Sequence, residues 1–282
     1  MRQRLSTCLL AFVLAPILAA YSAAAASHEM PPGLDCAEVP GTVHILSAGR
    51  IVMVGEVHGT REMPKEMLRL ACQALQRGLT VSVGLEMVDP DGALPVYMAS
   101  SGDAAARQAL LAARHWNGMR DGRSSLAWLD MIESFRSMRQ RGLPVSVFAL
   151  NDKPFTGDRD PAMAARLRKE HQAYPASLIF TYSGNVHSML TRADYLPAQV
   201  PTPMGAQVAD LDPVSLLLTS EAGEAWVCSG PQQCGVDRIP PTMQNGPLQV
   251  ARPAFSAGEY TLQLNVGPIT ASLPAVPVPP SK

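Results

Sequence analysis

The sequence predicts an α/β protein with a mostly parallel central sheet and helices on both faces. Short apolar segments alternate with longer amphipathic segments along residues 50–182. The last apolar segment, 177–182, is apolar almost throughout, as a strand buried on both faces of a parallel sheet should be. Strand–helix alternation of this kind is typical of right-handed crossovers between parallel strands.

The alternation resolves into four strands and three helices. Strands are expected at residues 50–54, 79–85, 145–150 and 177–182. Helices are expected at residues 64–77, from Ser124 or Ser125 to 141, and at 160–173. Met67, Ala71 and Leu75 recur at helical spacing in the first helix, and Gly78 ends it. A serine cap favours the start of the second, and Asp160-Pro161 favours the start of the third.

The C-terminal third has a different pattern. Short β-like segments at 214–219, 225–228 and 260–266 lie between glycine and proline clusters, and we expect a β-rich edge or flap. Residues 27–267 are predicted to form one domain. Residues 268–282 are Pro-rich and low in charge, which predicts a flexible tail. Residues 91–120 are expected to form one or two short helices that cover the site.

The first residues have the pattern of a signal peptide. Arg2 and Arg4 precede an apolar run over 9–20, and small residues continue to Ala26. Cleavage is expected after residue 26. No later stretch is long and apolar enough to span a bilayer, so no integral membrane segment is expected after leader removal. The predicted location is periplasmic or secreted.

The charge balance excludes some classes of partner. The chain has 23 Lys and Arg against 24 Asp and Glu, and loss of the two leader arginines gives 21 − 24 = −3. No basic run is present, which argues against nucleic acid and against an anionic membrane surface. A small-molecule ligand or substrate is the expected partner.

Four cysteines remain after the leader: Cys36, Cys72, Cys228 and Cys234. An exported protein can form disulfides. The turn-rich loop between Cys228 and Cys234 predicts a local bridge. Cys72 falls in an amphipathic helix and is expected to be a buried free thiol. The absence of a CxxC pair argues against a thiolate zinc site.

Ionisable residues gather at the ends of the predicted strands. They are Glu56, His58, Glu86 and His187. The carboxyl ends of parallel strands meet at one edge of a sheet, where ligands bind. Gly55 and Gly184 each stand three residues before a histidine, and we expect them to allow a sharp turn. This repetition predicts a shared functional site.

Each of these residues also has a structural interpretation. A lone loop histidine is usually solvated, and Glu86 alone could be a surface or capping carboxylate. Asp160 is expected mainly to cap its helix. Arg159 is expected in the site, as a cation for a carboxylate or an oxyanion. His115 and His171 lack the glycine turns and are expected at the surface.

Four segments resemble a known superfamily. They are Val-Gly-Glu-Val-His-Gly-Thr-Arg-Glu (54–62), Val-Gly-Leu-Glu-Met (83–87), Arg-Asp-Pro-Ala-Met-Ala (159–164) and Ser-Gly-Asn-Val-His (183–187). Over roughly residues 45–215 the chain resembles the superfamily that joins the erythromycin esterases, the ChaN haem-binding proteins and the Tiki/TraB proteins. The Glu–His spacing, the modest length and Trp116 favour a ChaN-like domain. The resemblance implies a pocket lined by Glu56, His58, Glu86, Arg159 and His187.

The first functional hypothesis is a hydrolase of an ester, lactone or amide. His58 would activate water as general base, oriented by Glu56 or Glu86, and His187 or Arg159 would stabilise the oxyanion. No Gly-x-Ser-x-Gly motif is present, so no serine nucleophile is expected. In a metal-assisted form, His58, Glu86 and His187 would bind a divalent metal with an open position for water.

The second hypothesis is a haem- or iron-binding protein, as the ChaN resemblance implies. Its axial ligands would be exposed tyrosines or histidines, with Tyr97, Tyr182 and Tyr195 as candidates. A purely structural role is the third alternative, and it leaves the repeated glycine–histidine turns unexplained.

Overall fold

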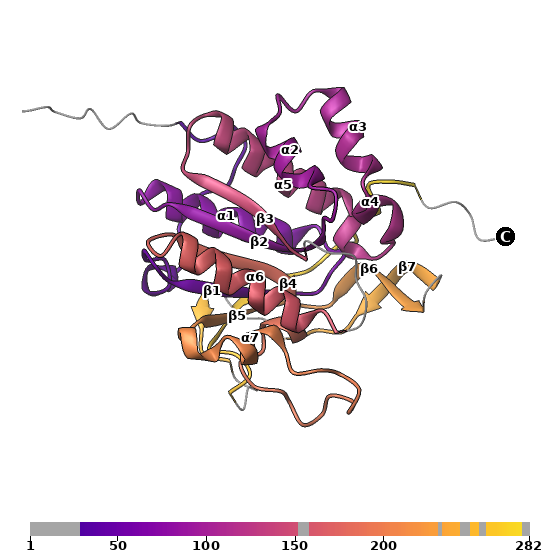
Figure 1. Ribbon diagram of the computed structural model, residues 1–282. Coiled ribbons are helices and arrows are strands. Elements are labelled where there is room, and N and C mark those ends of the chain that lie inside the picture. The colour runs from indigo at the N-terminus through magenta and orange to yellow at the C-terminus, as the bar shows by residue number, and fades with distance from the viewer. Residues whose placement is uncertain (1–28, 152–157, 231–232, 243–248, 254–257, 278–282) are drawn as a thin grey trace, which may run out of the picture.

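A seven-stranded sheet forms the centre of the molecule in the computed structural model, which describes residues 29–151, 158–230, 233–242, 249–253 and 258–277 (Figure 1). The strand order is β3-β2-β4-β1-β5-β9-β8. The strands are β1 (Ile51–Glu56), β2 (Val81–Val88), β3 (Val145–Asn151), β4 (Leu178–Gly184), β5 (Val214–Thr219), β8 (Val250–Ala251) and β9 (Leu262–Asn265). The predicted fold class is confirmed.

The strands that carry the predicted site lie next to one another. β4 pairs in parallel with β1 on one side and with β2 on the other. Gly55 is in register with Ser183, and Leu85 with Tyr182. All six residues of β1 are buried, as expected for a central parallel strand. The carboxyl ends of β1, β2 and β4 therefore meet at one edge of the sheet.

Helices cover both faces of the sheet (Figure 1). They are α1 (Glu62–Gln76), α2 (Ala93–Ala99), α3 (Ala104–Ala112), α4 (Arg114–Gly118), α5 (Leu126–Gln140), α6 (Asp160–Ala173) and α7 (Met204–Gln207). One apolar core joins the sheet to α1, α2 and α5, and a smaller core joins the opposite face to α6 and α7. The stretch 91–120 thus forms three short helices, and none of their residues lines the cavity described below.

The C-terminal β segments form both an edge and a flap. β5 and β9 continue the parallel sheet, and β8 adds an antiparallel edge to it. β6 (Gly223–Gly230) and β7 (Gln233–Ile239) form a separate antiparallel hairpin that projects beside the sheet (Figure 1).

The described part of the chain contains two disulfides. Cys228 and Cys234 face each other across the β6–β7 hairpin and are bonded, which confirms the predicted bridge. Cys36 and Cys72 form a second bond. The prediction that Cys72 is a free thiol is therefore wrong: Cys72 lies in α1, as predicted, but the N-terminal segment packs on this helix and brings Cys36 to it.

The expected flexible tail is packed over much of its length. Ile269 and Ser272 are buried, Ala271 forms a β-bridge with Thr60, and Pro274 forms one with Ser125. Residues 268–277 carry little charge, and this composition is compatible both with a packed segment and with a flexible tail. Residues 278–282 lie outside the described part of the chain.

The predicted leader, residues 1–26, also lies outside the described residues. Among those that are described, none belongs to a helix of sufficient length and apolarity to cross a membrane.

Candidate functional site

Glu56, which is buried, and His58, which is half-buried, form a dyad where β1 ends. The Nδ1 of His58 lies 2.7 Å from Oε1 of Glu56. The same carboxylate accepts hydrogen bonds from the indole of Trp128 at 3.1 Å and from the hydroxyl of Tyr182 at 2.5 Å. Glu56 is 1% exposed. These neutral donors hold the Glu56 carboxylate in place. The carboxylate in turn orients the His58 ring so that its Nε2 points toward Glu86.

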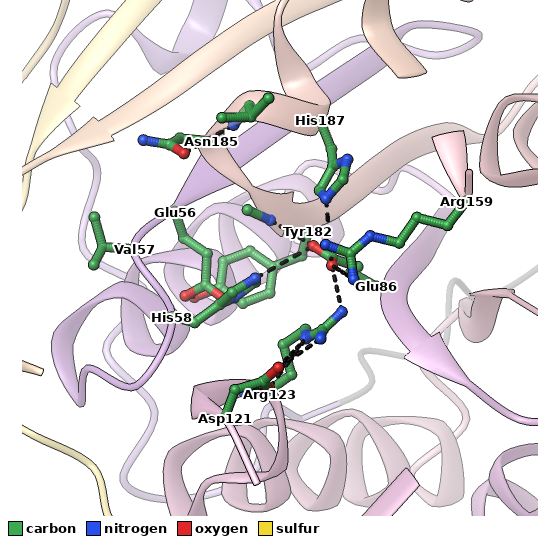
Figure 2. A network of polar contacts seen from close by, with 12 residues as sticks. Glu56, Val57, His58, Glu86, Asp121, Arg123, Arg159, Tyr182, Asn185 and His187 are labelled. Atoms are coloured by element: carbon green, nitrogen blue, oxygen red, sulfur yellow. Dashed lines mark hydrogen bonds and ion pairs between the residues drawn. The ribbon is translucent and has the colours of Figure 1, made fainter. Parts of the chain in front are cut away.

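Glu86 of β2 lies at the centre of the cluster (Figure 2). β2 continues to Val88, two residues beyond Glu86, with an irregular register after Leu85. Oε2 of Glu86 lies 3.3 Å from Nε2 of His58 and accepts the backbone N–H of Gly184 at 2.8 Å. Its Oε1 faces Nε2 of His187 at 3.5 Å. The predicted convergence of these strand ends is therefore present in the geometry.

A second histidine–carboxylate dyad mirrors the first. His187 belongs to a 3-10 turn, Asn185–Ser188, that follows β4. Its Nδ1 lies 2.8 Å from Oδ1 of Asp160, which also accepts the backbone N–H of Met204 at 2.6 Å. Asp160 is the first residue of α6 and does not cap it. The capping interpretation of Asp160 is therefore wrong, and the residue orients His187 instead.

Two arginines hold the central carboxylate. Nη1 of Arg123 lies 2.6 Å from Oε1 of Glu86, and Nη1 of Arg159 lies 3.1 Å from the same oxygen. The side chain of Arg123 is 7% exposed and also pairs with Asp121, whereas that of Arg159 is 30% exposed. The sequence predicts Arg159 in the site but gives no signal for Arg123, because the Asp-Gly-Arg turn at 121–123 has neither periodicity nor a strand end to mark it.

The glycines before the histidines serve close approach and not turn formation. Neither Gly55 nor Gly184 has a positive φ. A Cβ on Gly184 would lie 3.0 Å from Nε2 of His58, and one on Gly55 would lie 2.2 Å from the hydroxyl of Ser188. The residue with the left-handed backbone is Gly59, at φ 81°, directly after His58. The expected turn role of the first two glycines is therefore wrong.

The charged side chains around Glu86 shift one another's pKa values. Burial lowers the pKa of His58, but the carboxylates of Glu86 and Glu56 outweigh this and raise the pKa to about 9. Burial also opposes ionisation of Glu86, yet Arg123, His58 and His187 hold its pKa well below the usual range. Burial lowers the pKa of His187, and Glu86 and Asp160 raise it overall. The His58 ring therefore favours the imidazolium form at neutral pH.

The two dyads face a cavity of about 930 Å³. Its polar wall contains His58, Arg123, Arg159, Asp160 and His187. Its apolar wall comes from Val57, Val186, Val200, Pro201, Trp226 and Val227. The β6–β7 hairpin supplies the last two, so the flap expected from the sequence forms one side of the cavity. A ligand here would meet both charged groups and apolar surface.

The predicted metal set is not arranged as a metal centre. Among the described residues, no group of three or more His, Cys, Asp or Glu is placed to hold an ion. His58 and His187 do approach Glu86, but Arg123 and Arg159 occupy one oxygen of that carboxylate and Gly184 N–H the other. Two guanidinium groups at this position oppose a divalent cation. This geometry gives no support to the interpretation of His58, Glu86 and His187 as metal ligands.

The candidate haem ligands do not face the cavity. Tyr182 is fully buried with its hydroxyl on Glu56, and burial followed by that carboxylate raises its pKa well above the usual value. Tyr97 is bonded to Glu133. Tyr195 is exposed but does not line the cavity. None of the three presents a hydroxyl to an iron in this pocket.

The two histidines expected at the surface behave differently. His115 is 1% exposed, with Nε2 3.0 Å from the carbonyl oxygen of Arg123. Burial lowers the pKa of His115 to about 4. The surface expectation for His115 is therefore wrong, and the residue supports the Arg123 turn. His171 is half-buried in α6, outside the cavity.

Comparison with known proteins identifies the fold. No family model and no curated protein matches the chain. A succinoglycan biosynthesis protein has a TM-score of 0.58 at 11% identity, covering 82% of this chain and 90% of its own. A Bacillus cereus protein has a TM-score of 0.52 at 11% identity, with 83% and 92% covered.

A mutant of the erythromycin esterase EreC, in its open conformation, has a TM-score of 0.53 at 12% identity, covering 70% of this chain and 78% of its own. At such identities the likeness shows the fold alone. The chain therefore has an erythromycin esterase-like fold. These likenesses give no support to the ChaN or Tiki part of the sequence resemblance.

Proposed function

We propose that this protein is a hydrolase that acts on an ester, a lactone or an amide. The observation that carries the proposal is the pair of dyads, Glu56–His58 and Asp160–His187, whose four residues line one cavity and whose Nε2 atoms both approach the buried carboxylate of Glu86. Histidine oriented by a carboxylate through Nδ1 is the arrangement that general-base catalysis requires. The erythromycin esterase-like fold agrees with this class of reaction.

His58 is the proposed general base. With the Nδ1 proton directed at Glu56, the neutral ring carries a lone pair on Nε2. Water would attack the carbonyl carbon and pass one proton to that nitrogen. The tetrahedral intermediate would then expel the alcohol or amine, which takes the proton back from His58. The products are a carboxylic acid and the leaving group, and His58 ends as it began.

Arg159 and His187 are the proposed oxyanion partners. Arg159 is the more exposed of the two arginines on Glu86, so its guanidinium can contact a ligand without losing a buried pair. Glu86 and Asp160 raise the pKa of His187 against the effect of burial, which favours a proton on Nε2 that the ring can donate. Arg123, which is buried between Glu86 and Asp121, would instead hold Glu86 in place.

A panel of chromogenic esters, lactones and amides tests the proposal. We expect the wild type to turn over at least one of them, and His58→Ala to lower kcat by about 100-fold or more. His187→Ala should lower the same activity. His171→Ala is the matched control, since it removes a histidine outside the cavity, and it should leave kcat unchanged. Thermal melts should show that all three variants fold.

Two results would contradict the proposal. One is a wild type that hydrolyses no member of the panel. The other is a folded His58→Ala variant that retains full activity, which would show that the dyads are structural.

We also propose that the protein acts outside the cytoplasm. The signal-peptide pattern of residues 1–26 supports this, and so do two disulfides, which persist in oxidising compartments. An intact mass that begins after Ala26 is the expected result, and a mass that retains Met1 would contradict it.

A further inference from the structure

The packed C-terminal residues 269–275, here called the strap, lie between the two turns that carry His58 and Arg123. On one side, the N–H of Ser272 donates to the carbonyl oxygen of Gly59 at 2.8 Å. On the other, the N–H of Leu126 donates to Leu273 and the N–H of Ala275 donates to Ser124, both at 2.8 Å. The strap thus ties together two loops that are more than sixty residues apart in sequence.

Ser272 is the residue where these attachments meet. It is 2% exposed, and its hydroxyl oxygen accepts the N–H of Ala127, the second residue of α5, at 2.9 Å. An N-cap side chain normally accepts such a hydrogen bond. Ser125, which occupies the N-cap position, makes no side-chain cap, and its buried hydroxyl has no partner. Ser272 therefore caps α5 from a distance of 145 residues.

Each of the two hydrogen-bond partners of Ser272 is the chain neighbour of a residue that belongs to the Glu56–His58 dyad or contacts it. Gly59, which accepts its N–H, follows His58. Ala127, which donates to its hydroxyl, precedes Trp128, whose indole donates to Oε1 of Glu56. That oxygen is the one paired with Nδ1 of His58. Ser272 thus links the start of α5 to the turn after β1, and these two segments carry Trp128 and His58.

We infer that Ser272 is a positioning residue that fixes the Glu56–His58 dyad through the cap on α5. The inference rests on the proposed function for its catalytic consequence, whereas its structural part stands on the contacts themselves. Ser272 does not line the cavity. It acts through Trp128 and Gly59, so it should affect turnover and leave ligand binding nearly unchanged.

The indole resonances of ¹⁵N-labelled protein give a readout that needs no substrate. The chain has three tryptophans, and Trp128→Phe identifies the signal of the indole that is bonded to Glu56. We expect Ser272→Ala to move this signal because the cap beside it is lost. Ser272→Thr keeps the hydroxyl and should restore the wild-type position. The Trp116 signal serves as internal reference.

Thr270→Val is the matched control on the same strap. The hydroxyl of Thr270 donates to Glu62, the first residue of α1, at 2.7 Å and not to a residue of the dyad. This variant removes one strap hydrogen bond with little change of shape, so the Trp128 signal should stay in place. On the best ester of the panel, Ser272→Ala should lower kcat about tenfold with KM within about twofold, and Thr270→Val should change neither.

The outcomes separate the inference from the proposed function. An unmoved Trp128 signal in folded Ser272→Ala, or an equal movement in Thr270→Val, would overturn the positioning role whatever the activity. A moved signal in a protein that hydrolyses nothing would support the positioning role and refute the hydrolase. If Ser272→Ala does not fold, Ser272→Cys takes its place, because a thiol is a weak acceptor of similar size.

Discussion

At the scale of single residues, Glu86 is surrounded by positive charge. Arg123, Arg159, His58 and His187 all approach a carboxylate that is 1% exposed. A buried carboxylate is stable as an anion only when such partners offset the loss of water. Removal of the Glu86 charge would leave these four cationic groups facing one another without that counter-charge.

Glu86→Gln should therefore lower the free energy of unfolding by about 3 kcal/mol, measured by urea denaturation. Glutamine keeps the size of the side chain, so the loss reports charge and not packing. Glu66→Gln is the control: Glu66 is half-buried, one of its carboxylate oxygens has no partner, and burial raises its pKa to about 7. Glu66→Gln should change the free energy of unfolding by no more than about 0.5 kcal/mol. Equal stabilities of Glu86→Gln and wild type would contradict the electrostatic account.

Residue roles were predictable where a strand end marked them. Glu56, His58, Glu86 and His187 follow apolar runs and were found in the sequence. Asp160 was assigned to a cap because Asp before Pro at a helix start is a common capping pattern. Its partner, His187, is 27 positions away and gives no local signal.

At the scale of elements, the order of strands and helices was predictable because periodicity is local. α6 matches its predicted limits, and β5 does as well. The cap of α5 was not predictable: two serines at 124 and 125 offer a local cap, whereas the hydroxyl in use comes from Ser272. The Cys36–Cys72 bond was missed for the same reason, since it depends on how the N-terminal segment packs on α1.

The two disulfides should have separable effects. Cys228→Ser/Cys234→Ser frees the hairpin that supplies Trp226 and Val227 to the cavity, so KM should rise severalfold. Cys36→Ser/Cys72→Ser opens a longer loop far from the cavity, so it should cost about 4 kcal/mol of stability with KM unchanged. Steady-state kinetics and urea denaturation of both double variants check this. A hairpin variant with unchanged KM would show that the hairpin does not hold the ligand.

At the scale of the whole molecule, parallel topology brings the site together. β2, β4 and β1 are neighbours in the sheet, although their chain positions span residues 51–184. Their carboxyl ends deliver Glu56, Glu86 and His187 to one edge. The hairpin and the strap then close this edge from the C-terminal part of the chain. The sheet edge and the hairpin flap were predictable from the sequence, whereas the strap was not, because its hydrogen bonds to Gly59, Ser124 and Leu126 are all long-range.

The pH dependence of kcat/KM tests the central claim most directly, that His58 of the Glu56–His58 dyad is the base of a hydrolase. Glu86 and Glu56 raise the pKa of His58 to about 9, against burial, so the ring is protonated below that pH and cannot accept a proton from water. For wild type on its best ester, kcat/KM should therefore rise with pH through a midpoint near 9, and the midpoint should fall in Glu86→Gln, which removes one of the two raising charges. A profile that is flat from about pH 6 to 10, or that falls through pH 9, would contradict His58 as the base.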